Sequence, residues 1–326
     1  MKAVVCSEFG DIEGLSIAEV EPPEPGPGEV RIAVSAAGLN FADLLMVKGR
    51  YQDRREPPFT PGLEIAGRIE TVGAGVSGLG SGDRVMALVD GGGFAEFAVA
   101  RAVDVIRLPD TIDDVTAAGF AIAYGTAHGA LAWRASIRPG EKLLVHGAAG
   151  GVGLTAVEVG RRLGAHVTAT ARGGEKLAIA REHGADDVID SGSPDLVARL
   201  KAAHDGAGFD VIYDPVGGDV FDASLRAVAW EGRIVVIGFA SGTVPQVPAN
   251  ILLVKNATVA GFYWGSYRHR DPDRLRDSLA TLLDWHGEGA LRPLVSQDFP
   301  LDRAVDALDV IRSRRARGKV VLTIER

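Results

Sequence analysis

The sequence contains a single cysteine, Cys6, among 326 residues. One cysteine permits no disulfide within the chain and supplies no thiolate cluster for a structural zinc ion or an iron–sulfur cluster. No uninterrupted run of roughly 18 apolar residues occurs, so the sequence predicts no transmembrane helix and no membrane partner. The N-terminal residues lack a basic stretch followed by a long apolar run, and we therefore expect no secretory signal and a cytoplasmic location.

Basic residues are also in deficit, because 35 lysines and arginines face 43 aspartates and glutamates. A surface that binds nucleic acid must be basic, so a net charge of −8 argues against a nucleic-acid partner. Hydrophobic residues make up 46% and charged residues 24%, which is ordinary for a soluble globular protein. At roughly 150 residues per domain, the length predicts two domains with sizeable cores.

The first 110 residues have the pattern of a β domain. Short apolar segments at Val30–Ala37, Val85–Val89 and Ala95–Ala100 each follow a turn that contains glycine. In the same region, Phe41–Lys48 suggests a short helix. Closely spaced strands of this kind predict a compact, barrel-like β domain.

After Pro109 the pattern changes, and helical spacing first appears in Asp113–Trp133. From there, apolar segments of strand type alternate with helical segments, which is typical of a parallel, doubly wound α/β sheet. We expect strands at Lys142–His146, His166–Thr170, Val188–Ile189, Val211–Tyr213 and Ile234–Gly238, and helices at Leu154–Leu163, Lys176–His183, Pro194–Ala203 and Phe221–Ala229.

The C-terminal segment departs from this alternation. Asp273–Trp285 and Ala304–Arg312 have helical patterns, and Val320–Ile324 has that of a final strand. The simplest topology folds this segment back onto the N-terminal β domain, so that the α/β domain is an insertion. The basic run from Arg312 to Lys319 either forms a solvated face near a helix end, where the dipole favours cations, or contacts a phosphate.

The strongest local signal is Leu143–Leu154, in which a predicted strand passes through a glycine cluster into a predicted helix. Glycine permits a sharp turn, close approach of the backbone to a pyrophosphate and close packing of the helix on the sheet. The N–H groups at the start of the helix then bind the phosphates. The alternative is a tight turn in a domain that binds no dinucleotide. We expect cofactor contacts at Gly147, Gly150, Gly151, Val152 and Gly153.

The end of the second strand distinguishes NADP from NAD. An NAD site usually has an acid about 20 residues after the glycine loop, where it accepts hydrogen bonds from the ribose hydroxyls. Here Arg172 and Lys176 follow the strand, and a guanidinium could bind a 2′-phosphate that an acid would repel. We therefore predict NADPH. In the alternative interpretation both cations are solvated, and Glu175 could turn toward the ribose.

Several motifs resemble those of the medium-chain dehydrogenase/reductase superfamily. The segment Gly62–Gly67, followed by Gly73 and Val76, matches its GxExxGxxxxxGxxV frame. Over essentially the whole chain, and in order, the sequence resembles the zinc-free branch, which is the quinone oxidoreductase and zeta-crystallin group. The other matching segments are Gly38–Asp43, Gly82–Val85, His146–Gly153 and Asp214–Gly218.

The resemblance implies an α/β fold of two domains. A GroES-like β domain would comprise residues 1–121 and 268–326, and a Rossmann domain with a doubly wound parallel sheet would comprise residues 122–267. NADPH would bind in the cleft between them. The resemblance also implies a homodimer, in which the apolar, β-prone run Ala257–Gly265 pairs as an edge strand with its two-fold mate. The alternative is that another part of the chain covers this edge.

The positions that hold catalytic zinc in the related alcohol dehydrogenases carry other residues here. The resemblance places Leu63 where those enzymes have a histidine ligand, and Asn40 where they have a cysteine ligand. We therefore expect no metal. Without a Lewis acid, an enzyme loses a means of stabilising an alkoxide. Hydride delivery to an electron-poor quinone or α,β-unsaturated carbonyl stays feasible.

The resemblance also implies three catalytic residues, Asn40, Tyr51 and Thr126. Asn40 would orient the acceptor carbonyl, Tyr51 would stack on it or bond to it, and Thr126 would lie near the nicotinamide. The alternatives are a loop-capping asparagine, a packed surface tyrosine and a threonine bonded to its own helical turn. We expect neither Asn40 nor Tyr51 to be needed for folding.

The second domain is expected to complete the site. The loop at Gly238, Phe239 and Ala240 follows a predicted strand at the edge where open α/β sheets bind ligands, so it should contact the nicotinamide unless it is an ordinary turn. Phe239 and Trp264 would form an apolar acceptor slot with Asn40 and Tyr51. For His146, Asp43 and Glu64 we expect structural hydrogen bonds, with proton relay as the alternative for the two acids.

These observations predict a zinc-independent, NADPH-dependent quinone oxidoreductase whose partner is a small electron acceptor, a quinone or an activated enone. Two alternatives stay open. One is an enoyl-thioester (enoyl-CoA) reductase, to which Arg268, His269 and Arg270 would offer a basic entrance. The other is a non-catalytic, crystallin-like NADPH-binding protein.

Overall fold

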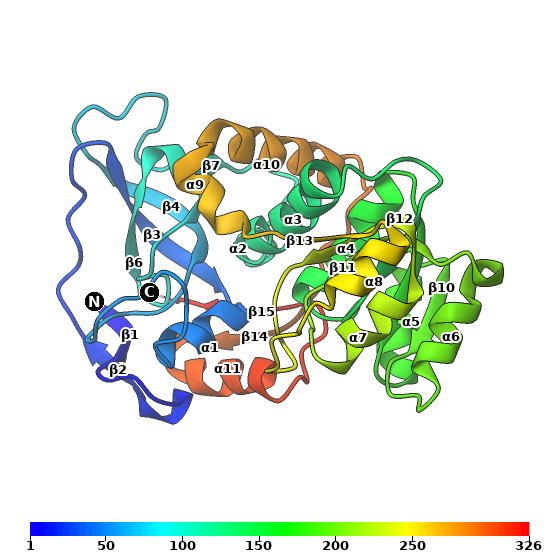
Figure 1. The fold of residues 1–326 in the computed structure, drawn as a ribbon. Helices are drawn as coiled ribbons and strands as arrows, with labels where there is room; N and C mark the ends of the chain where they lie inside the picture. The colour runs from blue at the N-terminus through cyan, green and yellow to red at the C-terminus, as the bar shows by residue number, and fades with distance from the viewer. Residues whose placement is uncertain (326) are drawn as a thin grey trace. The chain divides into compact units, whose positions relative to one another are not determined.

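The computed structural model describes residues 1–325. Its contacts divide the chain into two compact units, one formed by Met1–Ile122 with the segment from Pro293 onward, and one formed by Ala123–Arg292. The first is built around a mostly antiparallel β sheet and the second around a parallel sheet with helices, so the expected fold class is confirmed (Figure 1). No helix among the described residues is long and apolar enough to cross a membrane.

A seven-stranded sheet forms the first unit, with the order β14-β15-β3-β4-β5-β7 and with β6 paired to β3. The long strand β3 lies near its centre, and its apolar side chains Val30, Ile32 and Val34 are completely buried. β1 and β2 form a separate hairpin. The strands are β1 (Lys2–Cys6), β2 (Leu15–Glu19), β3 (Glu29–Gly38), β4 (Glu64–Val72), β5 (Arg84–Leu88), β6 (Phe97–Arg101), β7 (Val105–Arg107), β14 (Val295–Pro300) and β15 (Lys319–Thr323).

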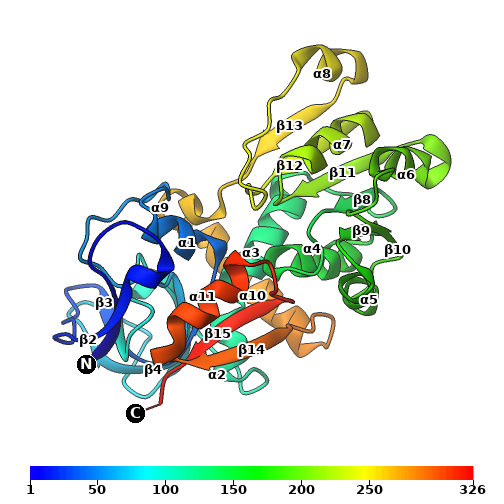
Figure 2. The ribbon, with the colours of Figure 1, turned by 90° about the horizontal axis from the view of Figure 1, so that it is seen from below.

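The C-terminal strand β15 completes this sheet. It pairs antiparallel with β3, which places Leu322 opposite Ala37. The helix α11 (Ala304–Arg312) lies along β15, with Ala307 and Leu308 fully buried (Figure 2). Residues far apart in the sequence are therefore neighbours in this unit. Its other helices are α1 (Phe41–Val47) and α2 (Asp114–Ala118), with 3₁₀ turns η1 (Ile12–Gly14), η2 (Ala102–Asp104) and η6 (Leu301–Arg303).

Six parallel strands form the second unit, in the order β10-β9-β8-β11-β12-β13 (Figure 2). Within this sheet, the chain passes first through the central strand β8 and then outward through β9 to β10. It returns to β11, on the other side of β8, and passes outward through β12 to β13. This is the strand order of the dinucleotide-binding doubly wound sheet, and the winding reverses between β8 and β11. The strands are β8 (Lys142–Val145), β9 (His166–Ala171), β10 (Asp187–Asp190), β11 (Phe209–Asp214), β12 (Val228–Val236) and β13 (Thr258–Gly261).

Helices connect these strands and extend the unit at both ends of its sequence. They are α3 (Ala121–His128), the π-helical turn η3 (Gly129–Arg134), α4 (Gly151–Arg162), α5 (Gly174–Glu182), α6 (Leu196–Ala202), η4 (Ala203–Gly206), α7 (Asp219–Ala227), α8 (Ala249–Lys255), η5 (Trp264–Ser266), α9 (Tyr267–Arg270) and α10 (Pro272–Gly287). The expected single helix Asp113–Trp133 is thus divided. The division falls at Gly119, which caps α2 and packs so closely on Lys319 that an added Cβ would lie 3.2 Å from its side chain.

The assignment of α10 also differs from the sequence expectation, which returns the chain to the first domain at residue 268. The contacts place α9 and α10 in the second unit and return the chain at Pro293. The Ser278 hydroxyl lies 2.6 Å from Nδ1 of His128, and the Trp285 ring packs edge-on against the same imidazole. An amphipathic pattern predicts that a helix packs against a neighbouring element, but it does not specify the unit to which that element belongs.

Candidate active site

The glycine loop connects β8 to α4 in the second unit. Gly147 has φ of 61°, a left-handed conformation that favours glycine. Gly153 lies so close to the preceding turn that an added Cβ would be 2.2 Å from the carbonyl oxygen of Gly147. The helix begins at Gly151, and no side chain caps it at Gly150. The loop therefore has the tight turn, the close backbone approach and the uncapped helix start that a pyrophosphate site requires.

His146, just before the loop, is a buried structural residue. Its Nε2 lies 2.8 Å from the hydroxyl of Ser224, which already donates to the Val220 carbonyl. Nε2 must therefore carry the proton, and Nδ1 accepts from the Thr170 hydroxyl at 2.7 Å. Burial lowers the pKa of His146, which keeps the imidazole neutral. The histidine links β8 to β9 and α7, in agreement with the supporting role expected for it.

Two further loops meet the glycine loop at the carboxyl edge of the sheet. Asp214 at the end of β11 accepts backbone hydrogen bonds from Val216 and Gly217. The loop after β12 is joined to this turn, because the Ala240 N–H donates to the Pro215 carbonyl at 3.1 Å. A Cβ added at Gly147 would lie 3.2 Å from the Val216 side chain. The predicted loop residues after β8 and β12 are therefore brought together at the point where the winding of the sheet reverses.

Arg172 follows β9 directly and is exposed, with partly buried Lys176 one turn into α5. An acid that the sequence pattern does not reveal lies beside it. Asp190 ends the neighbouring strand β10, where its carboxylate accepts from the N–H groups of Gly192 and Gly173. These hydrogen bonds, and more weakly the Arg172 guanidinium, hold the pKa of Asp190 below its usual range. The pairing of β10 with β9 places Asp190 opposite Ala171, the residue before Arg172. The position of this acid therefore depends on the register of the two strands, which the sequence does not show.

Thr126 and Trp264 lie together within the second unit. Trp264 is 4% exposed, and its ring packs on α3 so tightly that a Cβ added at Gly125 would lie 2.3 Å from it. Thr126, the next residue, is also buried. The indole Nε1 of Trp264 has no hydrogen-bond partner among the described residues. Phe239, the other residue predicted for an apolar slot, is 37% exposed.

Asn40 lies in a buried polar network of the first unit. It caps α1, and its backbone N–H donates to Asp43 at 2.7 Å. Its side-chain Nδ2 donates to Oε1 of Glu64 at 2.9 Å, and its Oδ1 accepts from Nζ of Lys319 at 2.8 Å. Lys319 also donates to Glu64 at 2.8 Å and to the Leu39 carbonyl at 2.7 Å. Because its amide is bonded on both sides, we expect Asn40 to contribute to the stability of the first unit, which the sequence alone did not indicate.

Asp43 is the member of this network whose burial is least compensated by hydrogen bonds. It is fully buried, and its Oδ1 has no hydrogen-bond partner among the described residues. Desolvation raises its pKa to about 7, against the opposing effects of the Asn40 N–H and the Lys319 ammonium. Glu64 is better paired, since its second oxygen accepts from the backbone N–H of Ile122 at 2.9 Å. The network therefore pairs the Lys319 ammonium directly with Glu64, and Asp43 is affected by it only as a nearby charge.

Comparison with known proteins identifies the family. Residues 26–110 match the model of the alcohol dehydrogenase GroES-like domain, and residues 151–284 match that of the zinc-binding dehydrogenase domain. The chain is 41% identical over 325 residues to the quinone oxidoreductase-like protein 2 homolog of Nematostella vectensis, covering 98% of this chain and 88% of that protein. The chain belongs to the quinone oxidoreductase family of medium-chain dehydrogenase/reductases.

Solved structures of this oxidoreductase family agree with the fold. The Escherichia coli quinone oxidoreductase complexed with NADPH has a TM-score of 0.94 and 30% identity, with 99% of this chain and 100% of that chain covered. A mycobacterial protein complexed with NADPH has a TM-score of 0.93 and 32% identity, with 99% and 100% covered. The expected GroES-like and Rossmann architecture is thereby confirmed.

The residues around position 40 of this quinone oxidoreductase family member do not fit a catalytic zinc ion. Leu63 offers no ligand atom, and the Asn40 and Glu64 oxygens already bind the Lys319 ammonium. The match to the zinc-binding dehydrogenase model begins at residue 151, beyond both positions. Among the described residues, the only group of three side chains that could share a metal ion lies in the second unit.

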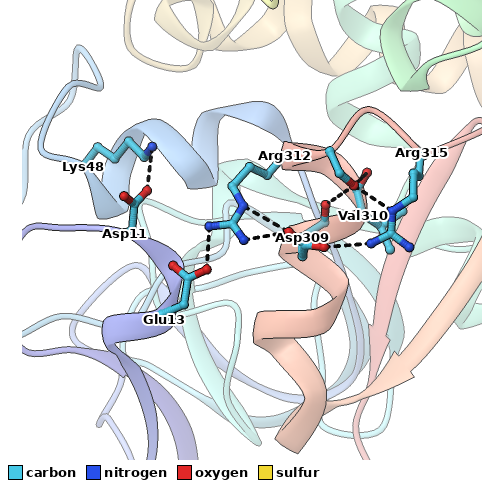
Figure 3. A network of polar contacts seen from close by, with 8 residues as sticks. Asp11, Glu13, Lys48, Asp309, Val310, Arg312 and Arg315 are labelled. Atoms are coloured by element: carbon cyan, nitrogen blue, oxygen red, sulfur yellow. Dashed lines mark hydrogen bonds and ion pairs between the residues drawn. The ribbon is translucent and has the colours of Figure 1, made fainter.

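The remaining predicted positions in the first unit lie at its surface. Tyr51 is partly exposed in the loop after α1. In the basic run, Arg312 forms ion pairs with Asp309 and Glu13, each at 2.7 Å, and Arg315 pairs with Asp309 at the same distance (Figure 3). These contacts agree with a solvated face, and they leave Lys319 as the buried exception in the run.

Proposed function

We propose that this family member is a zinc-independent reductase that passes a hydride from NADPH to a quinone or an activated enone. The observation that carries the proposal is the buried ammonium of Lys319, bound to Asn40 and Glu64. A zinc ion would have to displace this cation and would gain no ligand at Leu63. A reaction that needs no Lewis acid fits such a network, and reduction of an electron-poor acceptor is one.

The second unit supports NADPH as the hydride donor. Gly147 and Gly153 form a cradle that a Cβ would fill, and the start of α4 offers uncapped N–H groups to a pyrophosphate. Arg172 is exposed at the end of β9, where it can form a charge-assisted hydrogen bond to a 2′-phosphate. When bound, the cofactor supplies the hydride. The Gly238–Ala240 loop and Thr126 are proposed to hold its nicotinamide end.

The first unit is proposed to position the acceptor. Lys319 and Glu64 fix the Asn40 amide, so Asn40 acts as a rigid positioning residue. The phenol of Tyr51 is proposed to contact the acceptor carbonyl. The proton comes from water, and the protein's main contributions are proximity and exclusion of water from the reacting atoms.

We further propose that the protein is a homodimer joined through β13. This strand ends the six-stranded sheet, so one of its edges lacks a partner strand within that sheet. The helix α8 lies beside it (Figure 2). Leu253 and Val254 on α8 are each 78% accessible, and Trp230 on β12 is 67% accessible. An exposed edge beside an apolar patch is an aggregation hazard, and pairing with a second copy would cover both.

The test of the proposed reaction is NADPH consumption with 1,4-benzoquinone, 9,10-phenanthrenequinone, an enone and crotonyl-CoA in parallel. We expect a quinone to be reduced fastest, with activity that survives prolonged chelation. Preference for crotonyl-CoA would replace the proposal with a thioester reductase. Tight NADPH binding without turnover of any acceptor would replace it with a non-catalytic binding protein.

A further inference from the structure

Three side chains of the second unit converge outside the proposed cofactor site. His166, Asp187 and His204 each present one ligand atom, and these atoms all lie within 4.8 Å of one another. Nε2 of His166 is 2.8 Å from Oδ2 of Asp187. The two imidazole rings meet edge to face, with their centres 5.1 Å apart. The fold therefore gathers two imidazoles and one carboxylate from three separate segments.

The fold places this cluster at the opposite end of the sheet from the glycine loop. His166 is the first residue of β9 and Asp187 is the first residue of β10, whereas Arg172 follows the other end of β9. At about 3.3 Å per residue, the strand separates His166 from Arg172 by roughly 20 Å. The cluster is therefore distinct from the site proposed to bind NADPH.

Charged side chains of both signs surround the cluster. The Asp186 carboxylate lies 3.9 Å from Nδ1 of His166, the ring nitrogen that does not face Asp187. At this distance, and because the same oxygen already accepts from the backbone N–H of Val167, the carboxylate acts on the imidazole only as a nearby negative charge. Near His204, the negative charges of Asp187 and Asp210 favour a cation, whereas the charges of His166 and Lys142 oppose it.

His204 is held in place by its neighbours at some conformational cost. It has φ of 54°, and Asp205 after it has φ of 56°, so two consecutive non-glycine residues adopt the left-handed conformation. The ring of His204 packs edge-on against Phe209 and lies 3.3 Å from the Thr168 hydroxyl. This turn places the imidazole beside His166 and Asp187.

We propose that His166, Asp187 and His204 bind one divalent transition-metal ion of the zinc class. Bonds of about 2.0–2.2 Å place neighbouring tetrahedral ligand atoms roughly 3.4 Å apart, so small side-chain rotations from the present distances suffice. Two imidazoles select zinc, nickel or copper over magnesium and calcium, which prefer all-oxygen sites. The ion would clamp the η4 turn onto the start of β9 and β10, and water would complete its coordination.

This site also changes how a metal analysis of the protein is interpreted. Zinc retained at the His166 cluster would appear in elemental analysis although it takes no part in hydride transfer. A zinc ion needed for catalysis can be distinguished from one bound at the His166 cluster. Removal of the ion at the cluster should lower thermal stability and leave turnover with the best acceptor unchanged.

The experiment titrates the full-length protein with Zn²⁺ by calorimetry, with Mg²⁺ as the comparison ion. The variants are His166→Gln, Asp187→Asn and His204→Asn, the last chosen because asparagine tolerates the left-handed conformation. The exposed His269 is changed in the matched control, His269→Gln. We expect one Zn²⁺ per chain, an affinity reduced about tenfold or more in each cluster variant, and wild-type binding in the control.

A second measurement uses the wild-type protein, so it tests the proposal even if the variants fail to fold. Cu²⁺ bound to the wild-type protein should show nitrogen couplings from two imidazoles in its electron paramagnetic resonance spectrum. The proposal is overturned if Zn²⁺ binds no more tightly than Mg²⁺, if the folded cluster variants bind like the wild type, or if the copper spectrum shows no nitrogen ligands.

Discussion

The Nζ atom of Lys319 lies 2.8 Å from the Oδ1 atom of Asn40, although 279 positions separate the two residues in the sequence. The pairing of β15 with β3 creates this contact, because it brings the start of the last strand beside the segment that follows β3. The contact connects the stability of the first unit to the geometry of a predicted catalytic residue.

Removing this ammonium should destabilise the protein strongly. In Lys319→Met, Glu64 and Asn40 lose a buried partner, and loss of one member of a buried ion pair typically costs about 3–5 kcal/mol of unfolding free energy. Urea denaturation measures the effect. Arg315→Met, which removes an exposed ion pair with Asp309, is the control and should leave the midpoint nearly unchanged. Equal midpoints for the two variants would show that the buried network contributes little.

Asp43 should make stability depend on pH. Because burial raises its pKa from 3.8 to about 7, the folded protein keeps a proton that the unfolded chain releases. The stabilising contribution of this group is therefore complete below about pH 4 and is lost as the pH rises toward 7. Relative to the wild type, Asp43→Asn should gain roughly 4 kcal/mol across this interval.

Unfolding free energies of the wild type and Asp43→Asn over a series of pH values test that expectation. Asp306→Asn, a change at an exposed carboxylate that pairs with Arg303, serves as the control for an ordinary surface acid. If the difference between wild type and Asp43→Asn does not change with pH, the carboxyl of Asp43 has the same pKa in the folded and unfolded states.

Arg172 should determine the choice of cofactor. We expect the wild type to bind NADPH more tightly than NADH, and Arg172→Ala to weaken NADPH by about 1–3 kcal/mol with little effect on NADH, because only NADPH carries the 2′-phosphate. Fluorescence titration gives both dissociation constants. Arg161→Ala, on the far turn of α4, is the matched control. Equal affinities of the wild type for the two cofactors would refute the prediction.

Asn40 and Tyr51 should affect turnover more than cofactor binding. Asn40→Ala and Tyr51→Phe are expected to keep NADPH affinity within about 1 kcal/mol of the wild type, the scale of an ordinary hydrogen bond. At least one should reduce turnover with the best quinone about tenfold, equivalent to roughly 1.4 kcal/mol in the barrier. Asn40→Ala should also unfold more easily. If both variants turn over like the wild type, the acceptor lies elsewhere, and the segment around Arg268 in α9 is the next candidate.

The proposed dimer should depend on the apolar patch beside β13. Light scattering at micromolar concentration is expected to give a dimer for the wild type and a monomer for the double variant Leu253→Glu, Val254→Glu. Val197→Glu, which changes an exposed apolar residue on α6, should leave the dimer intact. A monomeric wild type would rule out this mode of assembly.

The sequence by itself determined the order of the elements and the position of the glycine loop. Strand and helix periodicity depend on neighbouring residues, so Ala304–Arg312 was predicted with its observed bounds, and most of the strands that were predicted agree to within a few residues. The strands β1, β2, β4, β7 and β14 were not predicted. Gly147 and Gly153 were predictable for the same reason, since the turn and the close helix approach are local. The resemblance added the family, which the relatives confirm.

Only the tertiary structure decided which distant side chains meet. Lys319 belonged to a surface basic run in the sequence, yet the register of β15 on β3 buries its ammonium against Asn40. His166, Asp187 and His204 carried no shared signal, because parallel strand starts and a left-handed turn bring them together across intervening helices. Periodicity specifies which face of an element is buried, whereas strand register and turn geometry determine what that face contacts.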